Sequence, residues 1–358
     1  MDALDGVLVD FSSPQRQLLA SLSLPLPADL RQQLLALSQP GDNEIARMGQ
    51  ADVELAMFSA ELVRQLLAHA QLSPSSIAAI GSHGQTIRHD PTARPAFTLQ
   101  ISDPNTLAAQ TGITTIADFR RRDMAEGGQG APLVPAFHAW LYQRCEFGRV
   151  VLNIGGMANI TILPAGTTSL VSGFDTGPGN ILLDSWIQHC HGLPMDHNGE
   201  WGKTGKVNPQ LLDRLLSDPY FPHPPPKSTG REHFNLSWLQ SHLAQLQCPD
   251  EDVMASLYAL TVRSISEAIT NFAGDCEEVV VCGGGAFNPL LMQGLQTALA
   301  SRRVIDSGAA EPSVEPRWME AMAFAWLARQ TLSGLSGNLP AVTGARHPAI
   351  LGGIYPGA

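Results

Sequence analysis

The sequence predicts an α/β protein of two domains, and three observations support this prediction. The chain has 358 residues, more than one hydrophobic core usually serves. Short apolar strands run directly into glycine-rich turns near Gly155, Asp175 and Gly283. Segments with apolar residues at helical spacing, such as 254–272, alternate with these strands. Ligands of α/β proteins usually bind where polar groups follow the carboxyl ends of strands, so these turns are the first candidates for a functional site.

Composition argues against several classes of protein. Hydrophobic residues make up 44% of the chain and charged residues 15%, which is an ordinary globular balance. The formal net charge of -11 argues against a nucleic acid or an anionic membrane as partner. The 5 cysteines are scattered without a CxxC pair, so neither a disulfide framework nor a zinc site is expected. We see no basic-then-apolar leader and no membrane-length apolar stretch, and we therefore expect a cytoplasmic location.

The first part of the chain predicts a strand followed by covering helices. Alternating apolar residues predict a strand at 6–11, and helical spacing predicts helices at 31–37 and 45–68. The segment 77–90 then brings an apolar strand into a polar turn that holds His83, Gln85 and Thr86. These side chains either bind a ligand or form a hairpin turn with a structural histidine.

A second polar segment follows the apolar strand expected at 113–117. It contains Asp118, then the arginines 120–122, and then Gln129 in a glycine-rich stretch. Three arginines in an acidic chain suggest recognition of a carboxylate or phosphate by a forked guanidinium, and the residues alone do not distinguish among the three. The alternative is a solvated charge cluster or a set of surface ion pairs.

Two glycine turns dominate the middle of the chain. The motif LNIGGMAN predicts a hairpin that turns at Gly155 and Gly156, and such a turn can wrap its amides around a phosphate. The motif GFDTGPGN places Asp175 on a second turn, and a helix is expected to begin just after Asn180. A carboxylate beside the amino end of a helix is an arrangement that phosphoryl transfer to a hydroxyl can use. Gly and Asp are also the default residues of purely structural turns.

A third glycine turn follows an apolar strand at 279–282. Gly283, Gly284 and Gly285 let a ligand approach the backbone closely, and a helix is expected to open near Asn288. The pattern is not GxGxxG, which disfavours a dinucleotide-binding Rossmann site. A last helix at 317–332 contains Glu320, a residue more often found on a surface than in a catalytic role. The loop 224–234 lacks the glycine spacing and the preceding strand of a P-loop, so we expect an ordered loop with ligand contacts through Lys227 or Arg231.

Taken together, these motifs resemble those of the anhydro-N-acetylmuramic acid kinase family. LNIGGMAN, GFDTGPGN, VCGGGAFN, ADFRRRD and GGQGAPLVPAFH carry the resemblance, which extends from Asp2 to Pro356. It implies a two-domain fold similar to those of actin and hexokinase (ribonuclease H-like), with ATP bound in a central cleft. The first domain is expected to cover 1–132 and the second 133–358, with the C-terminal tail packing back on the first.

The resemblance implies roles for individual residues. Asp175 matches the catalytic acid of the family, and Glu320 is a possible helper. The residues expected to bind ATP and its phosphates are Asp2, Gly155, Gly156, Asn159, Gly177, Gly179, Asn180, Gly283, Gly284, Gly285 and Asn288. The residues expected to bind the sugar are His83, Gln85, Thr86, Asp118, Arg120 and Gln129, with Arg120 facing the lactyl carboxylate.

The implied activity is an ATP-dependent step of cell-wall peptidoglycan recycling. The family opens the 1,6-anhydro bridge of 1,6-anhydro-N-acetylmuramic acid with water and phosphorylates O6, which gives N-acetylmuramic acid 6-phosphate. The resemblance also implies Mg²⁺ bridging the ATP phosphates, and a homodimer. The alternatives are another sugar kinase or an exopolyphosphatase of the same superfamily, or a binding module with weakened catalysis.

The beginning of the chain departs from the family pattern. The family begins with a strand and a Gly-Thr-Ser turn ahead of an Asp-Gly step, whereas this sequence starts at Met1 with Asp2 in the acid position and Ala3 in place of the glycine. We therefore expect the first phosphate turn to be incomplete and ATP binding by this 358-residue form to be weak.

Overall fold

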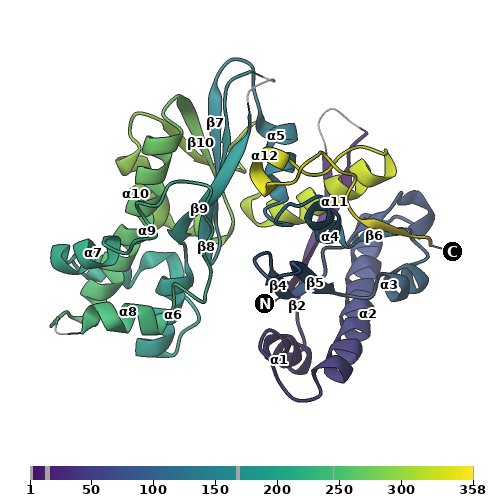
Figure 1. Ribbon diagram of the computed structural model, residues 1–358, viewed down its shortest axis with the longest axis horizontal. Helices are drawn as coiled ribbons and strands as arrows, with labels where there is room; N and C mark the ends of the chain where they lie inside the picture. Colours follow the sequence, from purple (N-terminus) through teal and green to yellow (C-terminus); the bar gives the residue numbers. More distant parts are fainter. Residues whose placement is uncertain (1–2, 13–16, 167–169, 245, 358) are drawn as a thin grey trace. The chain divides into compact units, whose positions relative to one another are not determined.

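The computed structural model describes residues 3–12, 17–166, 170–244 and 246–357. The chain forms two compact units, Met1–Phe137 with Glu320–Ala358, and His138–Met319 (Figure 1). The sequence analysis assigned all of 133–358 to the second domain, with a tail on the first, whereas the segment that belongs with the first unit begins at Glu320. Within the described residues, no helix has both the length and the apolar character needed to span a membrane.

The second unit is built on a five-stranded mixed sheet. In spatial order its strands are β11 (Arg303–Asp306), β10 (Cys276–Cys282), β7 (Gly148–Ile154), β8 (Met157–Leu163) and β9 (Ser172–Pro178). β7, β10 and β11 are parallel, and β8 is antiparallel to both β7 and β9. The consecutive residues Val150, Val151 and Leu152 are all fully buried, so both faces of β7 are covered.

The pairing of β7 with β10 brings two of the glycine turns to one edge of this sheet. Cys282 lies opposite Asn153, so the parallel strands end side by side. The turn at Gly155–Gly156 and the turn that begins at Gly283 therefore leave the sheet at the same place.

Helix α9 (Asp250–Phe272) is the central helix of the second unit. It packs against α6, α7, α10 and β9, and it buries Leu257, Leu260 and Ile265 in the main hydrophobic core. The other helices and 3-10 turns of this unit are α6 (Ile181–His191), η2 (His197–Gly199), η3 (Gly202–Thr204), α7 (Pro209–Leu216), α8 (Leu236–Leu243), η4 (Gly284–Phe287), α10 (Pro289–Ala298) and η5 (Pro316–Trp318). Helix α5 (Val134–Tyr142) contains the boundary between the units.

The described strands of the first unit form three small sheets. These are the hairpin β1 (Ala3–Asp10) and β2 (Gln17–Pro25), the hairpin β4 (Gln85–Asp90) and β5 (Phe97–Ile101), and a sheet of β12 (Gly353–Tyr355), β6 (Thr115–Ala117) and β3 (Ile80–Gly81). Because β12 pairs with β6, the C-terminal tail is part of this unit.

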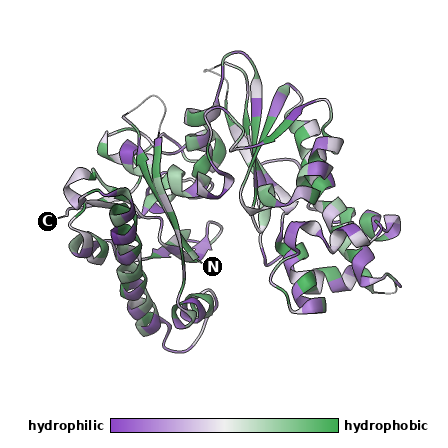
Figure 2. Ribbon diagram, turned by 180° about the vertical axis from the view of Figure 1, so that it is seen from behind, coloured by the Kyte–Doolittle hydropathy of each residue, from purple (hydrophilic) through white to green (hydrophobic). Residues whose placement is uncertain are grey.

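The long helix α2 (Glu44–Ala70) packs against β1, β2, β5, α1 and α3. Its hydrophilic and hydrophobic bands are visible in Figure 2, as expected for an amphipathic helix. The other helices of this unit are α1 (Ala28–Leu37), η1 (Pro74–Ser76), α3 (Pro104–Thr111), α4 (Phe119–Ala125), α11 (Met319–Leu332) and α12 (Pro340–Thr343).

The principal sequence expectation that differs from the structure concerns the arginine segment. Residues 119–125 form helix α4, where the sequence analysis expected a polar strand end. Asp118, in the left-handed conformation with φ 61°, separates β6 from this helix. Because successive helical residues point in different directions, the three arginines have different surroundings.

Candidate active site

Three polar side chains form a row across the sheet of the second unit. The strand register places Asn153 of β7 opposite Asn159 of β8, and Asn159 opposite Asp175 of β9. Directly opposed residues of antiparallel strands share one face of a sheet, with Cβ atoms about 4.5–5.5 Å apart. A carboxylate and two carboxamides are thereby assembled on one face.

The Asp175 carboxylate is held in a mostly dry environment. Its Oδ2 atom accepts a hydrogen bond of 3.0 Å from the Thr229 amide. Burial raises the pKa of Asp175 to about 6, the Thr229 hydrogen bond opposes this rise, and the negative charge of Glu232 adds to it. A carboxyl group with such a pKa is mostly deprotonated at neutral pH and is a stronger base than an ordinary aspartate.

The amino end of α6 contacts the turn between β7 and β8. The N–H groups of Gly179, Asn180 and Ile181 donate to the carbonyl oxygens of Gly155 and Gly156 at 2.8–3.0 Å. These three amides are therefore not available to an anion, although the sequence analysis expected this helix end to present free N–H groups to a phosphate. The turn and the helix end form one rigid structure.

Close packing requires glycine at two positions of the GFDTGPGN motif, Gly177 and Gly179. Gly177 has φ 145°, and a Cβ there would come within 2.8 Å of the Phe221 ring. A Cβ at Gly179 would overlap the Gly155 carbonyl oxygen. By contrast, a Cβ at Gly156 would meet nothing closer than Ile181 at 4.0 Å, so the space above the turn is open.

The three consecutive glycines after β10 differ from one another. A Cβ at Gly283, where φ is 79°, would overlap Asn153, and a Cβ at Gly285 would overlap Ile154. A Cβ at Gly284 would meet only the Asn180 side-chain nitrogen, at 3.9 Å. Gly284 is therefore the position of the three where a ligand could lie against the backbone.

The two asparagines of this region have different surroundings. The Asn180 side chain donates to the Ile154 carbonyl oxygen at 3.3 Å, which places its amide beside Gly284. Asn288 caps α10 through its side-chain oxygen and donates to the Tyr258 hydroxyl at 2.9 Å. Asn288 thus has a clear structural task, and its expected contact with adenosine stays a prediction.

In the first unit, Arg120 points from α4 toward His83. Its Nε atom donates to His83 Nε2 at 2.9 Å, and its Nη1 atom donates to the Gly130 carbonyl oxygen at 3.0 Å. Burial lowers the pKa of His83 to about 3, and the positive charge of Arg120 lowers it further. His83 is therefore a neutral acceptor that orients the guanidinium, and its ring packs on Phe324 with centroids 4.5 Å apart.

The other two arginines of α4 and Glu320 are exposed to solvent. Arg121 and Arg122 are exposed and form surface ion pairs with Asp118 at 3.5 Å and Glu126 at 3.6 Å. Glu320 is accessible to solvent at the start of α11, close enough to act electrostatically on Arg120. Of the three arginines, Arg120 is the one that the fold draws inward.

A cavity of about 300 Å³, lined by both polar and apolar residues, lies in the first unit beside His83. Its lining includes Asp118 together with Gln100 and Ser102, two residues that sequence reasoning missed. The Gln100 Oε1 atom and the Ser102 hydroxyl are buried and have no hydrogen-bond partner within the described part of the chain. Buried polar atoms of this kind are normally satisfied, so the cavity offers unused hydrogen-bonding capacity.

The remaining expected sugar-binding residues are partly engaged by the protein. Gln85 donates to the Thr86 carbonyl oxygen at 3.1 Å, and the Thr86 hydroxyl accepts from the Gln100 side chain at 3.1 Å. Gln129 is exposed, and its backbone N–H donates to the Thr343 carbonyl oxygen at 2.8 Å. Asp2, which was expected to bind ATP and its phosphates, lies outside the described residues.

One of the missed residues, Asn153, could have been found from a sequence signal. Asn153 precedes the Gly-Gly turn in LNIGGMAN, and a tight hairpin there would pair it with Asn159. Thr229 could not be found in this way, because its contact with Asp175 spans 54 positions and passes through an irregular loop.

Nearly the whole chain matches one protein family and individual proteins of that family. Residues 1–357 match the family described as anhydro-N-acetylmuramic acid kinase. The protein of that name from Shewanella putrefaciens is 51% identical over 356 residues, which cover 99% of this chain and 95% of the relative. The corresponding protein from Coxiella burnetii is 50% identical over 357 residues, covering 100% and 95%.

One solved structure is similar only at a low level. The activator of the 2-hydroxyisocaproyl-CoA dehydratase from Clostridium difficile with bound ADPNP has a TM-score of 0.42 and 13% identity, covering 93% of this chain and 94% of that one. This similarity is too weak to support conclusions about the site.

Proposed function

Because the chain belongs to the anhydro-N-acetylmuramic acid kinase family, we propose that Asp175 is the base of the reaction that this family catalyses. The chain is an ATP-dependent phosphotransferase with an alcohol group as acceptor. It opens the anhydro ring of 1,6-anhydro-N-acetylmuramic acid and phosphorylates O6, a step of peptidoglycan recycling.

The observation that carries this proposal is the geometry of the Asp175 carboxylate. Oδ2 is occupied by the Thr229 amide, whereas Oδ1 has no hydrogen-bond partner among the described residues. The carboxylate is thus fixed through one oxygen while the other remains available to a water molecule. Burial raises the pKa of this group to about 6, which suits a general base that works near neutral pH.

The proposed chemistry needs one base. Asp175 takes a proton from the water that attacks C1, the C1–O6 bond breaks, and the electron pair of that bond passes to O6. O6 then attacks the γ-phosphorus, and ADP leaves. One proton of the water ends on Asp175, and the other remains on the new C1 hydroxyl. The protein contributes the position of the base and a preorganised polar surrounding.

We assign recognition of the sugar to the first unit. The Arg120 guanidinium is held by His83 and Gly130, and among the described residues no hydrogen bond occupies its Nη2 atom. A guanidinium fixed in this way suits the lactyl carboxylate of the muramic acid. The cavity beside His83, with the free polar atoms of Gln100 and Ser102, suits hydroxyl or acetamido groups.

We assign ATP to the glycine turns of the second unit. Gly156 and Gly284 face open space at the same sheet edge, and the Asn180 amide lies beside Gly284. Mg²⁺, which the family resemblance implies, would neutralise the charge of the ATP phosphates bound at these turns.

Homodimer formation and a cytoplasmic location remain parts of this proposal. They follow from the family resemblance and from the composition of the chain. Sedimentation of the purified protein would test the dimer.

Turnover in ¹⁸O-labelled water tests the proposed reaction. We expect one labelled oxygen at C1 of the product and none in its phosphate group, since water attacks carbon. Glucose and inorganic polyphosphate serve as control substrates, and we expect neither to be used. Label in the phosphate, or efficient turnover of either control substrate, would contradict the proposal.

A further inference from the structure

The loop 218–235, which joins α7 to α8, binds Asp175 at three points. The Asp175 amide donates to the Lys227 carbonyl oxygen at 3.3 Å, and the Tyr220 hydroxyl donates to the Asp175 carbonyl oxygen at 2.6 Å. The third contact is the Thr229 amide on Oδ2. Backbone and side chain of Asp175 are therefore both held by one loop.

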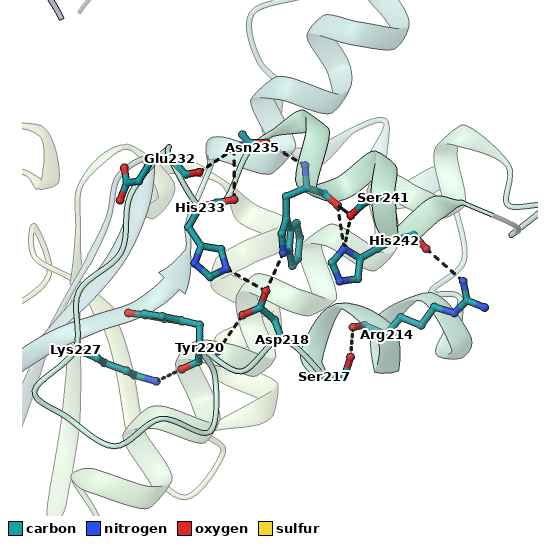
Figure 3. A network of polar contacts seen from close by, with 11 residues as sticks. Arg214, Ser217, Asp218, Tyr220, Lys227, Glu232, His233, Asn235, Ser241 and His242 are labelled. Atoms are coloured by element: carbon teal, nitrogen blue, oxygen red, sulfur yellow. Dashed lines mark hydrogen bonds and ion pairs between the residues drawn. The ribbon is translucent and has the colours of Figure 1, made fainter. Parts of the chain in front are cut away.

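A buried carboxylate, Asp218, anchors this loop. It is 8% exposed and accepts three hydrogen bonds, from the Tyr220 amide at 2.9 Å, His233 Nε2 at 3.0 Å and Trp238 Nε1 at 2.8 Å. Figure 3 shows Tyr220 and His233 beside Asp218, and Trp238 adds a contact from α8. Asp218 thus joins the start of the loop, its end and the following helix.

The interior of the loop is packed and internally bonded. Lys227 donates through Nζ to the carbonyl oxygens of Tyr220 and Phe221, at 3.1 and 2.9 Å, and lies 4.7 Å above the Tyr220 ring. Phe234 is fully buried and packs edge-on against Tyr220 and Trp238. Lys227 is therefore used within the loop, where the sequence analysis expected a possible ligand contact.

We propose that the loop 218–235 is a positioning element for the Asp175 carboxylate, and that Asp218 is the positioning residue that holds the loop in place. Asp218 acts through Tyr220 and His233, which connect it to the segment that carries Thr229. Because the loop occupies Oδ2, the oxygen that receives the proton is Oδ1. This inference rests on the assignment of Asp175 as the base.

The charged and titratable groups around Asp175 make the role measurable. From the loop these are Tyr220, Lys227 and Glu232, and Asp218 with His233 lies behind them. The Thr229 amide is the contact that lowers the pKa of Asp175, whereas burial and Glu232 raise it. Burial is the largest of these effects, so a loosened loop that admits water to the carboxylate lowers the pKa of Asp175, even though the Thr229 contact weakens too.

Asp218→Asn is the direct test in the 358-residue enzyme. The variant keeps the size of the side chain, but its NH₂ group must face at least one of the three N–H donors that Asp218 accepts. We expect kcat to fall by about tenfold to a hundredfold, as for a base displaced by roughly 1 Å. We also expect the acid limb of the pH profile of kcat/KM to move to lower pH, because burial is the main cause of the raised pKa of Asp175, while KM for ATP stays unchanged.

Two further variants keep this test informative. Tyr220→Phe removes one hydroxyl and should lower kcat by a few-fold with the same direction of pH shift, even if Asp218→Asn folds poorly. Asp213→Asn changes an exposed carboxylate on α7 and serves as the matched control, with wild-type kinetics expected. Circular dichroism would establish that each variant is folded.

The outcomes separate this inference from the assignment of the base. If Asp175→Asn retains activity, the base assignment is wrong. If Asp175→Asn is inactive but folded Asp218→Asn and Tyr220→Phe keep the wild-type acid limb, the positioning role is overturned, whatever happens to kcat.

Discussion

At Asp175, burial and hydrogen bonding act in opposite directions on one carboxyl group. Burial is the larger effect and raises the pKa to about 6, while the Thr229 amide opposes it. The motif GFDTGPGN indicated an acid on a turn, but it could not indicate this balance, because both effects come from residues far along the chain. The contact with Thr229 depends on how the loop 218–235 folds.

The pH dependence of the reaction should report this carboxyl group. A base must be deprotonated to act, so we expect kcat/KM for the sugar to fall with decreasing pH through an apparent pKa of about 6. Glu232→Gln removes the nearby negative charge and should move this limb to lower pH. An acid limb near pH 4 in the wild type would contradict the environment described for Asp175.

Arg120 is the second residue for which we propose a chemical role. The sequence offered three adjacent arginines as equivalent candidates. The helical conformation of α4 distinguishes them, because it turns Arg120 toward His83 and leaves Arg121 exposed. His83 is bonded to the guanidinium and lines the neighbouring cavity, and its expected contact with the sugar stays a prediction.

Arg120→Lys should therefore weaken binding of the lactyl carboxylate. We expect KM for 1,6-anhydro-N-acetylmuramic acid to rise by about tenfold to a hundredfold, the usual value of a charged hydrogen bond. KM for 1,6-anhydro-N-acetylglucosamine, which lacks the lactyl group, should change little. His83→Leu should follow the same pattern more weakly, and His83→Gln should restore part of the affinity. Arg122→Lys, which changes an exposed arginine of the same helix, is the control, and an equal rise with both sugars in Arg120→Lys would argue against this recognition.

At the scale of elements, the strands and long helices were the most predictable part. The apolar strands at β7 and β10 and the amphipathic helices α2 and α9 lie where periodicity placed them. Helix α4 was missed because its seven residues are mostly charged and begin after a left-handed Asp118. Short polar helices of this kind depend on tertiary contacts, here the packing of Phe119 and the burial of Asp123.

The triple-glycine turn allows a test with a built-in control. Gly283→Ala places a methyl group against Asn153 at a positive φ, so we expect a loss of stability of about 2–4 kcal/mol. The methyl group of Gly284→Ala would make only an ordinary contact with the Asn180 side-chain nitrogen, at 3.9 Å, so the variant should fold normally, but it should raise KM for ATP. Thermal unfolding and ATP kinetics of the two variants check this prediction. Equal effects of both substitutions on stability would contradict the distinction between the two glycines.

At the scale of the whole molecule, the division into two units was predictable, but the path of the chain through them was not. Length and the succession of glycine turns indicated two domains. The return of the chain to the first unit at Glu320 depends on long-range pairing, such as that of β12 with β6, which no local pattern encodes. The site residues of each unit are likewise assembled from distant segments.

Burial of the Asp175 carboxylate should reduce the stability of the folded chain at neutral pH. Folding raises the pKa of Asp175, so the folded state binds its proton more tightly than the unfolded state does. Wild-type stability should therefore fall as pH rises from about 4 to about 6. Asp175→Asn lacks this penalty and should be more stable than the wild type at pH 8 by about 1–3 kcal/mol, with no such gain at pH 4. Urea unfolding at both pH values measures this difference.

Single-turnover phosphorylation by Asp175→Asn tests the central claim most directly. The substitution keeps the shape of the side chain and removes the base, so we expect ATP binding to persist and the rate of product formation to fall by about a hundredfold to ten-thousandfold. A folded Asp175→Asn enzyme that forms product at more than about a tenth of the wild-type rate would show that the base lies elsewhere.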